Sequence, residues 1–347
     1  MSLTEKFPEN SDGTILFHLP KNMFERCFSA RDCRRLEEVI GCHYPESRAG
    51  ESLLSTWDRL APQARAVVTG WDSPPITDEM LAVAPELEAI VHSAGSVRPF
   101  IPDTIWASGV RVATCNDALG KGVAETALGL MIAGLKGFFP NGNLTRQGHW
   151  QETIPATGFG RVRELYDVTI GIIGASRTGR HVIRLLSEFE ADVVLFDPTL
   201  SAADAALMDV RLVSLDELMR VSDVVSLHAP ALPQLRHMLG AREFSAMKDD
   251  AIFINTARGM LVDEAALIAE LETMRISAIL DITYPEPPSM TSLFRTLPNV
   301  TLLPHIAGAI STGNFRQGGS TVDQLLELLH GQTMSGEINH DQFVFMA

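Results

Sequence analysis

The sequence predicts an α/β protein of two doubly wound domains, each with a parallel sheet covered by helices on both faces. The first observation is a strand, a tight turn, a helix and a second strand over residues 168–197. The second is the alternation of short apolar runs, helical patterns and short loops on both sides of that stretch, which favours parallel sheets. The third is the length of 347 residues, since a domain usually holds about 100–200 residues.

Residues 168–197 have the pattern of a dinucleotide-binding unit. A first apolar run ends at Gly174, and a helix begins close to Gly179. Such a turn uses three glycines, for the sharp turn, for the approach of a pyrophosphate and for helix packing. Ser176 holds the middle position, so a merely structural unit of this shape is the alternative. If a pyrophosphate binds, we expect the main donors to be the N–H groups at the start of the helix, those of Arg177 and Thr178.

Asp197 ends the second apolar run, about 20 residues after the turn, where a ribose-binding carboxylate belongs. A carboxylate at this place accepts hydrogen bonds from the ribose hydroxyls and repels a 2′-phosphate. The following residues, Pro198, Thr199 and Leu200, supply no cation. The sequence therefore predicts NAD rather than NADP as the cofactor.

The composition describes an ordinary globular protein with a large core. Hydrophobic residues make up 46% and charged residues 20% of the chain. The 28 basic and 43 acidic residues give a net charge of −15, with no basic cluster. Such a surface argues against nucleic acid and anionic membranes as partners, and an anionic substrate would need a local cationic pocket.

The four cysteines show no paired spacing typical of a disulfide framework or a zinc site. A metal pair at Cys42 and His43 is the one alternative, and it lacks further ligands nearby. No signal peptide and no run of 18 apolar residues is present. We therefore expect a reduced, cytoplasmic protein without a metal.

The first part of the chain begins with a loose leader of about ten residues. Ser29 is a predicted N-cap for a helix that ends at Gly41. A long helix over residues 118–139 is apolar on almost every side, as expected for a helix buried between layers. The pattern predicts strands at 13–19, 66–69 and 89–92, and a further helix from residue 77.

The second part follows an irregular arm over residues 140–163 that contains Trp150. Its predicted strands are at 168–173, 193–196, 223–227, 251–255, 277–281 and 300–303, and its predicted helices begin near 177 and cover 242–247, 263–271 and 312–330. If the strands pair in parallel, their carboxyl ends lie at one edge. The loops at that edge would then point five side chains into one cleft: His228, Arg258, Asp281, Glu286 and His305.

Residues 92–99, HSAGSVRP, follow a strand at the edge where open α/β sheets bind ligands. Bare N–H groups around Gly95 and Ser96 could receive a carboxylate, and Arg98 adds a cation. An ordinary turn with an exposed arginine explains the same residues. Trp71, in the turn over residues 70–75, completes the candidate substrate-binding set.

Three side chains carry the predicted chemistry. Oxidation of a secondary alcohol by hydride transfer needs a base for the hydroxyl proton, and His305 is the candidate. Glu286 behind the imidazole would favour its protonated form when a keto acid is reduced. Arg258 offers a planar fork that holds a carboxylate by two hydrogen bonds. Each residue alone also has a structural explanation.

Three motifs give the sequence a family resemblance. They are the segment from VVSLHAP to AALIAEL, which contains TARG, then LDITYPEPP, and then LLPHIAGA. With VAETALGLMIAG, they resemble the D-isomer-specific 2-hydroxyacid dehydrogenase family over about residues 66–330. The resemblance implies a Rossmann nucleotide domain, residues 119–311, inserted in a flavodoxin-like substrate domain formed by residues 1–118 and 312–347.

The resemblance also implies roles for the site residues. Arg258 would bind the substrate carboxylate, Glu286 would support the histidine, and His305 would be the acid/base. Asp281 would contact the nicotinamide carboxamide, and Asp197 the ribose. Backbone around Gly95 and Ser96 would bind the substrate carboxylate. The remaining cofactor-binding positions would be His228, Ala229, Pro230, Thr256, Ala257 and Gly308.

Two departures from the family pattern concern Ser176 and the loop AGSVRPF, where the family usually has glycines before a polar Asp-Asn run. The substrate is therefore the least transferable property: phosphoglycerate, glycerate, glyoxylate and bulkier 2-oxo acids all stay open. Glu286 argues against formate dehydrogenases, which carry an amide there. The apolar helix at 123–135 and the Trp150 arm resemble the dimer-forming parts of the family, so we expect a homodimer.

Two other functions fit parts of the sequence. One is an NAD(H)-binding sensor with little turnover, which the Arg258, Glu286 and His305 set argues against and Ser176 mildly favours. The other is an enzyme that binds S-adenosylmethionine or adenosylhomocysteine with a similar unit, and it does not require that set.

Overall fold

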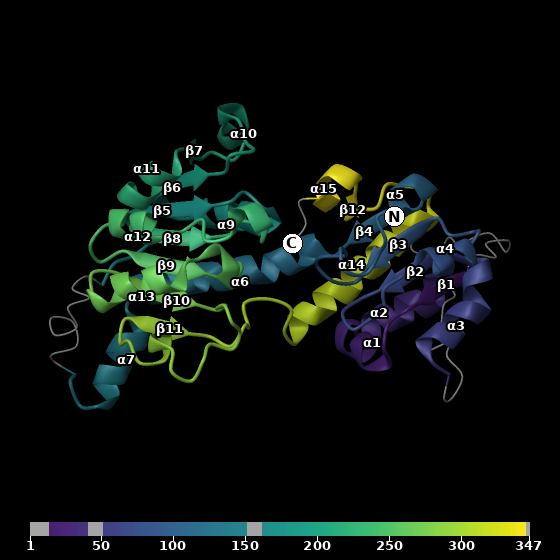
Figure 1. Ribbon diagram of the computed structural model, residues 1–347, viewed down its shortest axis with the longest axis horizontal. Helices are drawn as coiled ribbons and strands as arrows, with labels where there is room; N and C mark the ends of the chain where they lie inside the picture. Colours follow the sequence, from purple (N-terminus) through teal and green to yellow (C-terminus); the bar gives the residue numbers. More distant parts are fainter. Residues whose placement is uncertain (1–13, 41–50, 151–161, 345–347) are drawn as a thin grey trace. The chain divides into compact units, whose positions relative to one another are not determined.

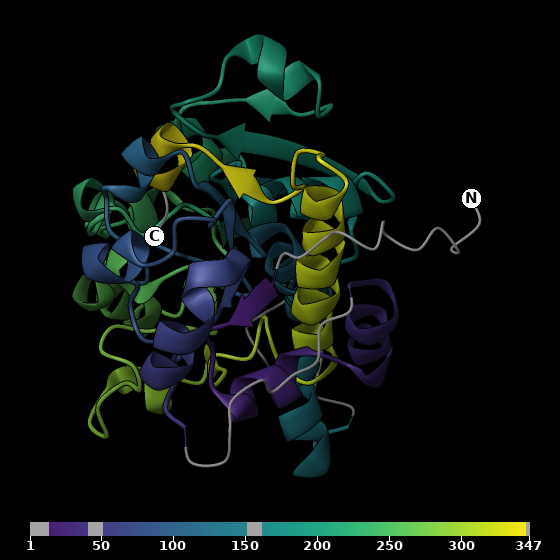
Figure 2. The ribbon, with the colours of Figure 1, turned by 90° about the vertical axis from the view of Figure 1, so that its right-hand side faces the viewer.

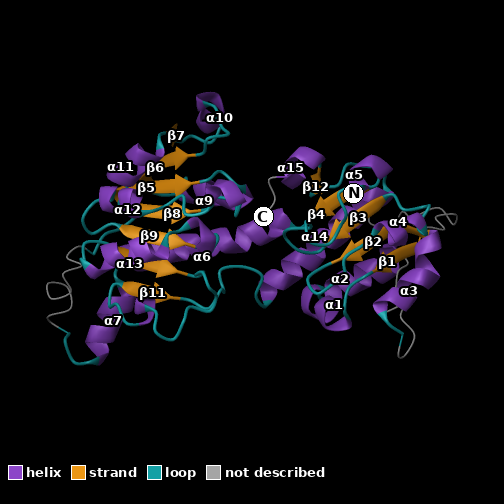
Figure 3. Cartoon of the chain, in the orientation of Figure 1, coloured by secondary structure: helices purple, strands orange, loops and turns teal. Residues whose placement is uncertain are grey.

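The computed structural model describes residues 14–40, 51–150 and 162–344. The chain divides into two compact units, Met1–Leu119 with Ala309–Ala347 and Gly120–Gly308. In each unit a mostly parallel sheet lies between helices (Figures 1 and 3). The predicted α/β class is therefore confirmed. Cys42 and His43 lie outside the described residues.

The first unit has a five-stranded sheet in the order β1-β2-β3-β4-β12. Strands β1 to β4 pair in parallel, and β12 pairs antiparallel with β4. The strands are β1 (Thr14–Phe17), β2 (Ala64–Thr69), β3 (Ala89–His92), β4 (Arg111–Thr114) and β12 (Glu337–Ile338). Its helices are α1 (Lys21–Cys27), α2 (Ala30–Arg35), α3 (Leu53–Leu60), α4 (Asp78–Ala82), α5 (Ile105–Ser108), α14 (Thr312–Leu329) and α15 (His340–Val344).

The strand order determines which helices cover each face of the first sheet, and the long helix α14 covers one of these faces. Because β1 to β4 follow one another across the sheet, right-handed crossovers place the connecting helices α3, α4 and α5 on one face. The core on that face includes Trp57, Ile90 and Ile105. The opposite face, with Phe17 and Val91, is covered by α1 and by α14. Figure 2 shows α14, in yellow, as the long helix of this unit.

The second unit has a seven-stranded parallel sheet in the order β11-β10-β9-β8-β5-β6-β7. The chain direction across the sheet reverses between β5 and β8, which makes this the switch point where Rossmann folds bind dinucleotides. The strands are β5 (Tyr166–Ile173), β6 (Glu190–Phe196), β7 (Arg211–Leu212), β8 (Val224–Leu227), β9 (Ile252–Asn255), β10 (Ser277–Leu280) and β11 (Val300–Leu302).

Helices cover both faces of this second sheet. One face packs against α9 (Arg177–Leu186) and the long helix α6 (Asn116–Leu135). The other packs against α11 (Leu215–Val221), α12 (Ala241–Ala246) and α13 (Glu264–Glu272). A further short helix, α10 (Ala202–Ala206), follows β6. Alternate residues of each strand therefore enter two separate apolar cores, as buried parallel strands require.

The helix predicted over residues 118–139 is observed as two helices, α6 and α7 (Phe138–Arg146). Gly137 separates them with a φ of 62°, a left-handed conformation that interrupts the helix. The irregular arm predicted from residue 140 is therefore wrong up to Arg146. Pro140 lies in the first turn of α7, where its missing N–H breaks no helical bond. Residues 151–161 of that arm lie outside the described residues.

By length and composition alone, α6 is long and apolar enough to cross a membrane, and 39% of its most apolar part is buried. A core helix of a soluble protein meets the same criteria. Five of its residues pack into the core beside β5 and β9: Ala124, Ala127, Leu130, Met131 and Leu135.

Near the N-terminus, Ser29 caps α2 as predicted, in a reciprocal box with Asp32. The predicted single helix instead changes to a π-helical turn over Leu36–Ile40. The sequence patterns missed strands β4, β7 and β12 and helices α1, α3, α5, α10, α11 and α15. Four 3-10 turns complete the described elements: Ala61–Gln63, Pro233–Leu235, Gly259–Leu261 and Leu293–Arg295.

Candidate active site

The turn after β5 requires glycine at its first and last positions. Gly174 has a φ of 95°, and a Cβ on it would lie 2.7 Å from the backbone nitrogen of Ala229. A Cβ on Gly179 would lie 2.1 Å from the carbonyl oxygen of Gly174. The first glycine therefore permits the turn and a close approach to the β8 loop. The last permits α9 to pack against the turn.

Ser176 occupies the middle position as a helix N-cap. Its φ of −58° is open to any residue, and its Oγ accepts the N–H of Gly179 at 3.3 Å. The hydroxyl therefore satisfies one of the free N–H groups at the start of α9. The remaining donors at this helix end include the N–H groups of Arg177 and Thr178.

Asp197 follows β6 and ties its end to the glycine turn. One carboxylate oxygen accepts the N–H of Ala175 at 2.8 Å. The other accepts the N–H and the hydroxyl of Thr199 at 2.9 and 2.6 Å. A carboxylate offers about four acceptor positions, so these three bonds leave capacity for one more. That is compatible with one hydroxyl of a ribose.

His228 follows β8, but its side chain is directed into the protein. It is 4% exposed, and its Nε2 pairs with the Ser226 hydroxyl at 2.9 Å. Burial lowers the pKa of His228 to about 4, so the imidazole is neutral. The expectation that this side chain faces a cleft was therefore wrong. Its Nδ1 and the Thr256 hydroxyl have no hydrogen-bond partner within the described residues.

Arg258 lies in the turn after β9, and the Asn255 side chain holds this turn by two hydrogen bonds. The Asn255 amide accepts the N–H of Ala257 at 3.0 Å and donates to the carbonyl of Arg258 at 3.2 Å. The Arg258 side chain is exposed, yet it is surrounded enough that desolvation lowers its pKa, and Glu286 opposes this shift. It remains a cation at neutral pH. Sequence reasoning missed Asn255, although it directly precedes the motif TARG.

Two loops of the site lie against each other at Gly259. A Cβ there would come 2.3 Å from the carbonyl carbon of Thr283 and 2.6 Å from the nitrogen of Tyr284. Glu264, the first residue of α13, accepts the N–H of Tyr284 at 2.6 Å. Burial raises the pKa of Glu264. These contacts hold the loop that leads to Glu286 beside the turn that carries Arg258.

His305 and Glu286 form a direct pair. Nδ1 of His305 lies 2.6 Å from Oε1 of Glu286, and both side chains are partly open to solvent. An ionised carboxylate only accepts hydrogen bonds, so in such a pair Nδ1 is the donor and Nε2 is the ring nitrogen left for another partner. The backbone of His305 has a φ of 54°, which is uncommon for this residue type.

Asp281 explains how His305 is held in that conformation. The backbone carbonyl of Asp281 accepts the N–H of His305 at 3.0 Å. Its carboxylate, which is 1% exposed, accepts the N–H groups of Ile306 and Ala307 at 2.8 and 2.9 Å. The aspartate therefore fixes the loop after β11 to the end of β10. Its predicted contact with a nicotinamide carboxamide stays a prediction.

The candidate residues of the first unit lie in loops after β2 and β3. The guanidinium of Arg98 lies 6.0 Å from the ring of Phe343 in α15, and that of Arg26 lies 5.8 Å from the ring of Trp71. Gly95 is closely approached, since a Cβ there would be 3.1 Å from the Asn116 amide oxygen. No sequence signal indicated that Arg26 lies beside Trp71.

The second unit therefore gathers most of the predicted set at the carboxyl edge of one sheet. The glycine turn, Asp197, Arg258, Glu286 and His305 all follow neighbouring parallel strands. Gly308, the last residue of that unit, follows the His305 loop.

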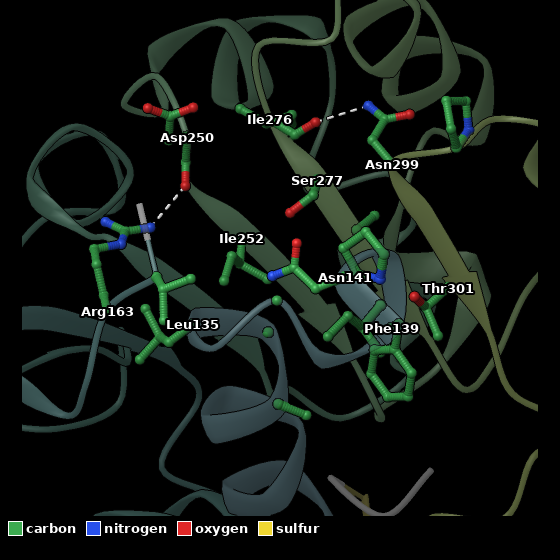
Figure 4. A pocket seen from close by; sticks show the side chains of 18 of the residues that line it. Leu135, Phe139, Asn141, Arg163, Asp250, Ile252, Ile276, Ser277, Asn299 and Thr301 are labelled. Carbon is green, nitrogen blue, oxygen red and sulfur yellow. Dashed lines mark hydrogen bonds between the residues drawn. The ribbon is translucent and has the colours of Figure 1, made fainter. Parts of the chain in front are cut away.

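A cavity of about 60 Å³ lies at the other end of this sheet, near the starts of β9 and β10. Figure 4 shows Arg163 bound to the carbonyl of Asp250 and Asn299 bound to the carbonyl of Ile276. None of the predicted catalytic or cofactor-binding residues lines it. Within the described residues, no group of three His, Cys, Asp or Glu side chains could hold a metal ion.

Curated relatives of the chain are dehydrogenases and reductases. It is 30% identical over 266 residues to D-3-phosphoglycerate dehydrogenase of Methanocaldococcus jannaschii, covering 76% of this chain and 50% of that protein. It is 29% identical over 327 residues to glyoxylate/hydroxypyruvate reductase B of Klebsiella pneumoniae, covering 92% and 96%. The chain thus spans about half the length of the phosphoglycerate dehydrogenases it matches.

Solved structures agree with the fold. A Thermus thermophilus protein matches with a TM-score of 0.69 and 26% identity, over 93% of this chain and 99% of that one. A phosphoglycerate oxidoreductase from Rhizobium etli matches with a TM-score of 0.78 and 24% identity, over 93% and 97%.

The family model for the D-isomer specific 2-hydroxyacid dehydrogenase, NAD binding domain, matches residues 128–307. That match covers just over half of the chain and contains the glycine turn, Asp197, Arg258 and His305. The chain therefore belongs to the D-isomer specific 2-hydroxyacid dehydrogenase family, and this segment is its NAD-binding domain.

Proposed function

We propose that this protein transfers a hydride between NAD(H) and a small D-2-hydroxy acid or its 2-oxo acid. The pairing of His305 with Glu286 at 2.6 Å carries the proposal, because it lies at the same sheet edge as the cofactor turn. Arg258, from the neighbouring strand end, adds the cation that a carboxylate substrate needs.

His305 is the acid/base of the proposed reaction. In the oxidation direction, its Nε2 takes the proton of the substrate hydroxyl as the hydride leaves C2. In the reduction direction, the same atom returns a proton to the carbonyl oxygen. Glu286 holds Nδ1–H in place and stabilises the imidazolium that forms. When NAD is bound, its nicotinamide ring is the hydride acceptor.

Arg258 orients the substrate. Its guanidinium would hold the substrate carboxylate by two parallel hydrogen bonds, which fixes C2 relative to His305. In the first unit, we propose that the loop around Gly95 and Ser96 offers backbone N–H donors to a carboxylate. Trp71 and Arg98 would contact the remainder of the substrate, and Arg98 would suit a phosphate.

The cofactor would lie on the loops after β5, β6, β8, β9 and β10. Arg177 and Thr178 would receive the pyrophosphate at the start of α9. Asp197 would bind the adenosine ribose, and the backbone from His228 to Pro230 and at Thr256 and Ala257 would line the site. The unpartnered hydroxyl of Thr256 supports a polar ligand beside the loop after β9.

The test is a screen of NADH oxidation with glyoxylate, hydroxypyruvate, 3-phosphohydroxypyruvate and bulkier 2-oxo acids. We expect at least one acid to be reduced, and an Arg258→Ala variant to raise KM and lower kcat strongly. Retained kcat/KM in that variant would remove Arg258 from the mechanism. Arg211 of the edge strand β7, which pairs with Glu217, provides the arginine control, and Arg211→Ala should keep the native kcat/KM.

An NAD(H)-binding sensor is the alternative outcome of the same screen. NADH binding, followed by fluorescence, without oxidation by any acid would favour the sensor. Failure to bind NADH at all would contradict both functions and would favour an S-adenosylmethionine or adenosylhomocysteine site.

We further infer a cytoplasmic homodimer without nucleic acid or membrane partners. The net charge of −15 supports the absence of anionic partners. Phe138 and Phe139, which are 59% and 36% exposed, support an apolar contact near α7. Sedimentation should give twice the chain mass, and Phe138→Asp should lower the association constant.

A further inference from the structure

The long helix α14 has an unusual buried face. Its buried residues include four with polar side chains: Asn314, Gln317, Thr321 and Gln324. They recur at helical spacing, so they form one stripe toward the sheet of the first unit. Burying an amide costs folding free energy unless its hydrogen bonds are satisfied. We therefore expect each of these side chains to bond a specific partner.

Gln317 bonds the backbone at the start of the predicted substrate loop. Its side chain is fully buried, and its amide nitrogen donates to the carbonyl of Ser93 at 3.2 Å. Its backbone carbonyl accepts the Cys115 thiol at 3.5 Å. Ser93 is held from its other side, since its N–H donates to the carbonyl of Thr69 at 2.7 Å. Gln317 therefore anchors the loop directly after β3, which ends at His92.

The loop beyond this anchor keeps its donors free. The carbonyl of Ala94 accepts the N–H of Cys115 at 2.9 Å. In the part of the chain that the structure describes, the N–H groups of Gly95 and Ser96 have no acceptor. The anchors thus take up carbonyl groups and leave N–H groups for an anion.

α14 is itself held in a fixed rotation. A Cβ on Gly318 would lie 2.1 Å from the carbonyl oxygen of Cys27, so the helix meets the end of α1 backbone to backbone. With its amide turned so that both ends are satisfied, Asn314 donates to the carbonyl of Ala309 at 2.6 Å and to the Gln317 amide oxygen at 3.2 Å. The direction of the Gln317 side chain is therefore set by the close contact of Gly318 with Cys27 and by the hydrogen bond from Asn314.

We propose that Gln317 is a positioning residue that holds the loop His92–Pro99 so that its free N–H groups receive the substrate carboxylate. The inference rests on the proposed function for the identity of that anion. The anchoring of the loop by the Gln317 amide does not depend on catalysis, so it can be measured without an activity assay.

The first experiment measures the anchor itself in the full-length protein. Gln317→Met keeps size and burial and removes the donor to Ser93. We expect hydrogen–deuterium exchange at the bonded amides of Ser93 and Cys115 to become about tenfold faster. Gln324→Met is the matched control for the Ser93 readout, because Gln324 is equally buried on the same stripe but bonds the carbonyl of Thr114, the N–H of Gly336 and the Cys115 sulfur. It should leave Ser93 exchange within about twofold.

The second experiment measures the consequence, with the 2-oxo acid that the screen identifies. Gln317→Met should raise KM for that acid about tenfold at saturating NADH, equivalent to about 1.4 kcal/mol. The Kd of NADH should stay within about twofold. If Gln317→Met fails to fold, Gln317→Asn, which withdraws the amide by one methylene, takes its place.

The outcomes separate the two proposals. Unchanged exchange at Ser93, or the same KM change in the Gln324→Met control, overturns the positioning role. Faster exchange without any acid being turned over by the native protein supports the anchor and contradicts the proposed enzyme.

Discussion

The two units share an architecture and differ in how they hold the loops at the carboxyl edge of their sheets. In the second unit, carboxylates accept backbone N–H groups: Asp197 binds Ala175, and Asp281 binds Ile306 and Ala307. In the first unit, the amides of Gln317 and Gln324 donate to backbone carbonyls.

The difference is consistent with the proposed function of each edge. A buried carboxylate is an acceptor with a charge, so it suits an edge that exposes the cations Arg258 and His305 once protonated. A neutral amide consumes carbonyl groups and adds no negative charge beside a site for an anionic substrate. The difference fits the proposed function, in which His305 of the second unit is the acid/base and the loop around Gly95 and Ser96 of the first unit binds an anion.

Loss of His305 should give the largest effect and should separate the roles of the two edges. His305→Ala should lower kcat by about 10³–10⁴, since positioned acid/base catalysis is typically worth about 10²–10⁴. Arg98→Ala in the first unit should change mainly KM. Steady-state kinetics with the best 2-oxo acid measures both. Equal losses of kcat in the two variants would contradict the assignment of chemistry to the second unit.

Gly174→Ala should rank second and should disrupt the cofactor edge alone. The new Cβ would meet Ala229 at 2.7 Å with a φ of 95°, for a combined cost of about 3 kcal/mol. NADH binding should weaken at least about 100-fold by fluorescence titration. Gly109→Ala is a control with a φ of 82° and open space around it. Normal NADH affinity in Gly174→Ala would refute the turn as the pyrophosphate site.

Lowering the pH should reduce the free energy of unfolding of the two units by different amounts. Burial lowers the pKa of His18 to about 4 and that of His92 to about 3 in the first unit, and that of His228 to about 4 in the second. Their unfolded forms bind a proton near pH 6.5, so stability is complete above that pH and falls as the pH drops towards 4. At pH 5 each histidine costs about 2 kcal/mol.

The first unit should therefore lose about twice as much stability as the second from these histidines between pH 7.5 and 5. Hydrogen exchange of core amides in β3 and in β8 at both pH values measures the two losses. A larger loss in β8 would contradict this ranking.

Ser176→Gly should give the smallest effect. Removing the N-cap should cost only a few tenths of a kcal/mol, because glycine is itself tolerated at an N-cap. The freed N–H of Gly179 becomes available to the pyrophosphate, so NADH should bind slightly more tightly. If affinity rose more than about tenfold in a fluorescence titration, the serine would be a real handicap rather than a tolerated cap.

Local patterns predicted the second unit well, because its strands are apolar runs buried on both faces and its turns carry glycine. The first unit was predicted less completely. α1 and β4 are short and lack a strong period, and the polar stripe on α14 contradicts the usual apolar pattern of a buried helix face. Its polar residues make sense only beside the carbonyl groups of Ser93 and Thr114, which are more than 200 residues away.

The sequence by itself determined the alternation of strands and helices, the glycine turn and the family, since these depend on local period, backbone freedom and motif order. Only the tertiary structure decided which groups partner one another. It brought the expected His305–Glu286 pair to hydrogen-bond distance, turned the His228 side chain inward, made Ser176 a helix cap and placed Asp281 beneath the His305 loop. Hydrogen-bond partners are set by the packing of distant strands, and no local pattern records them.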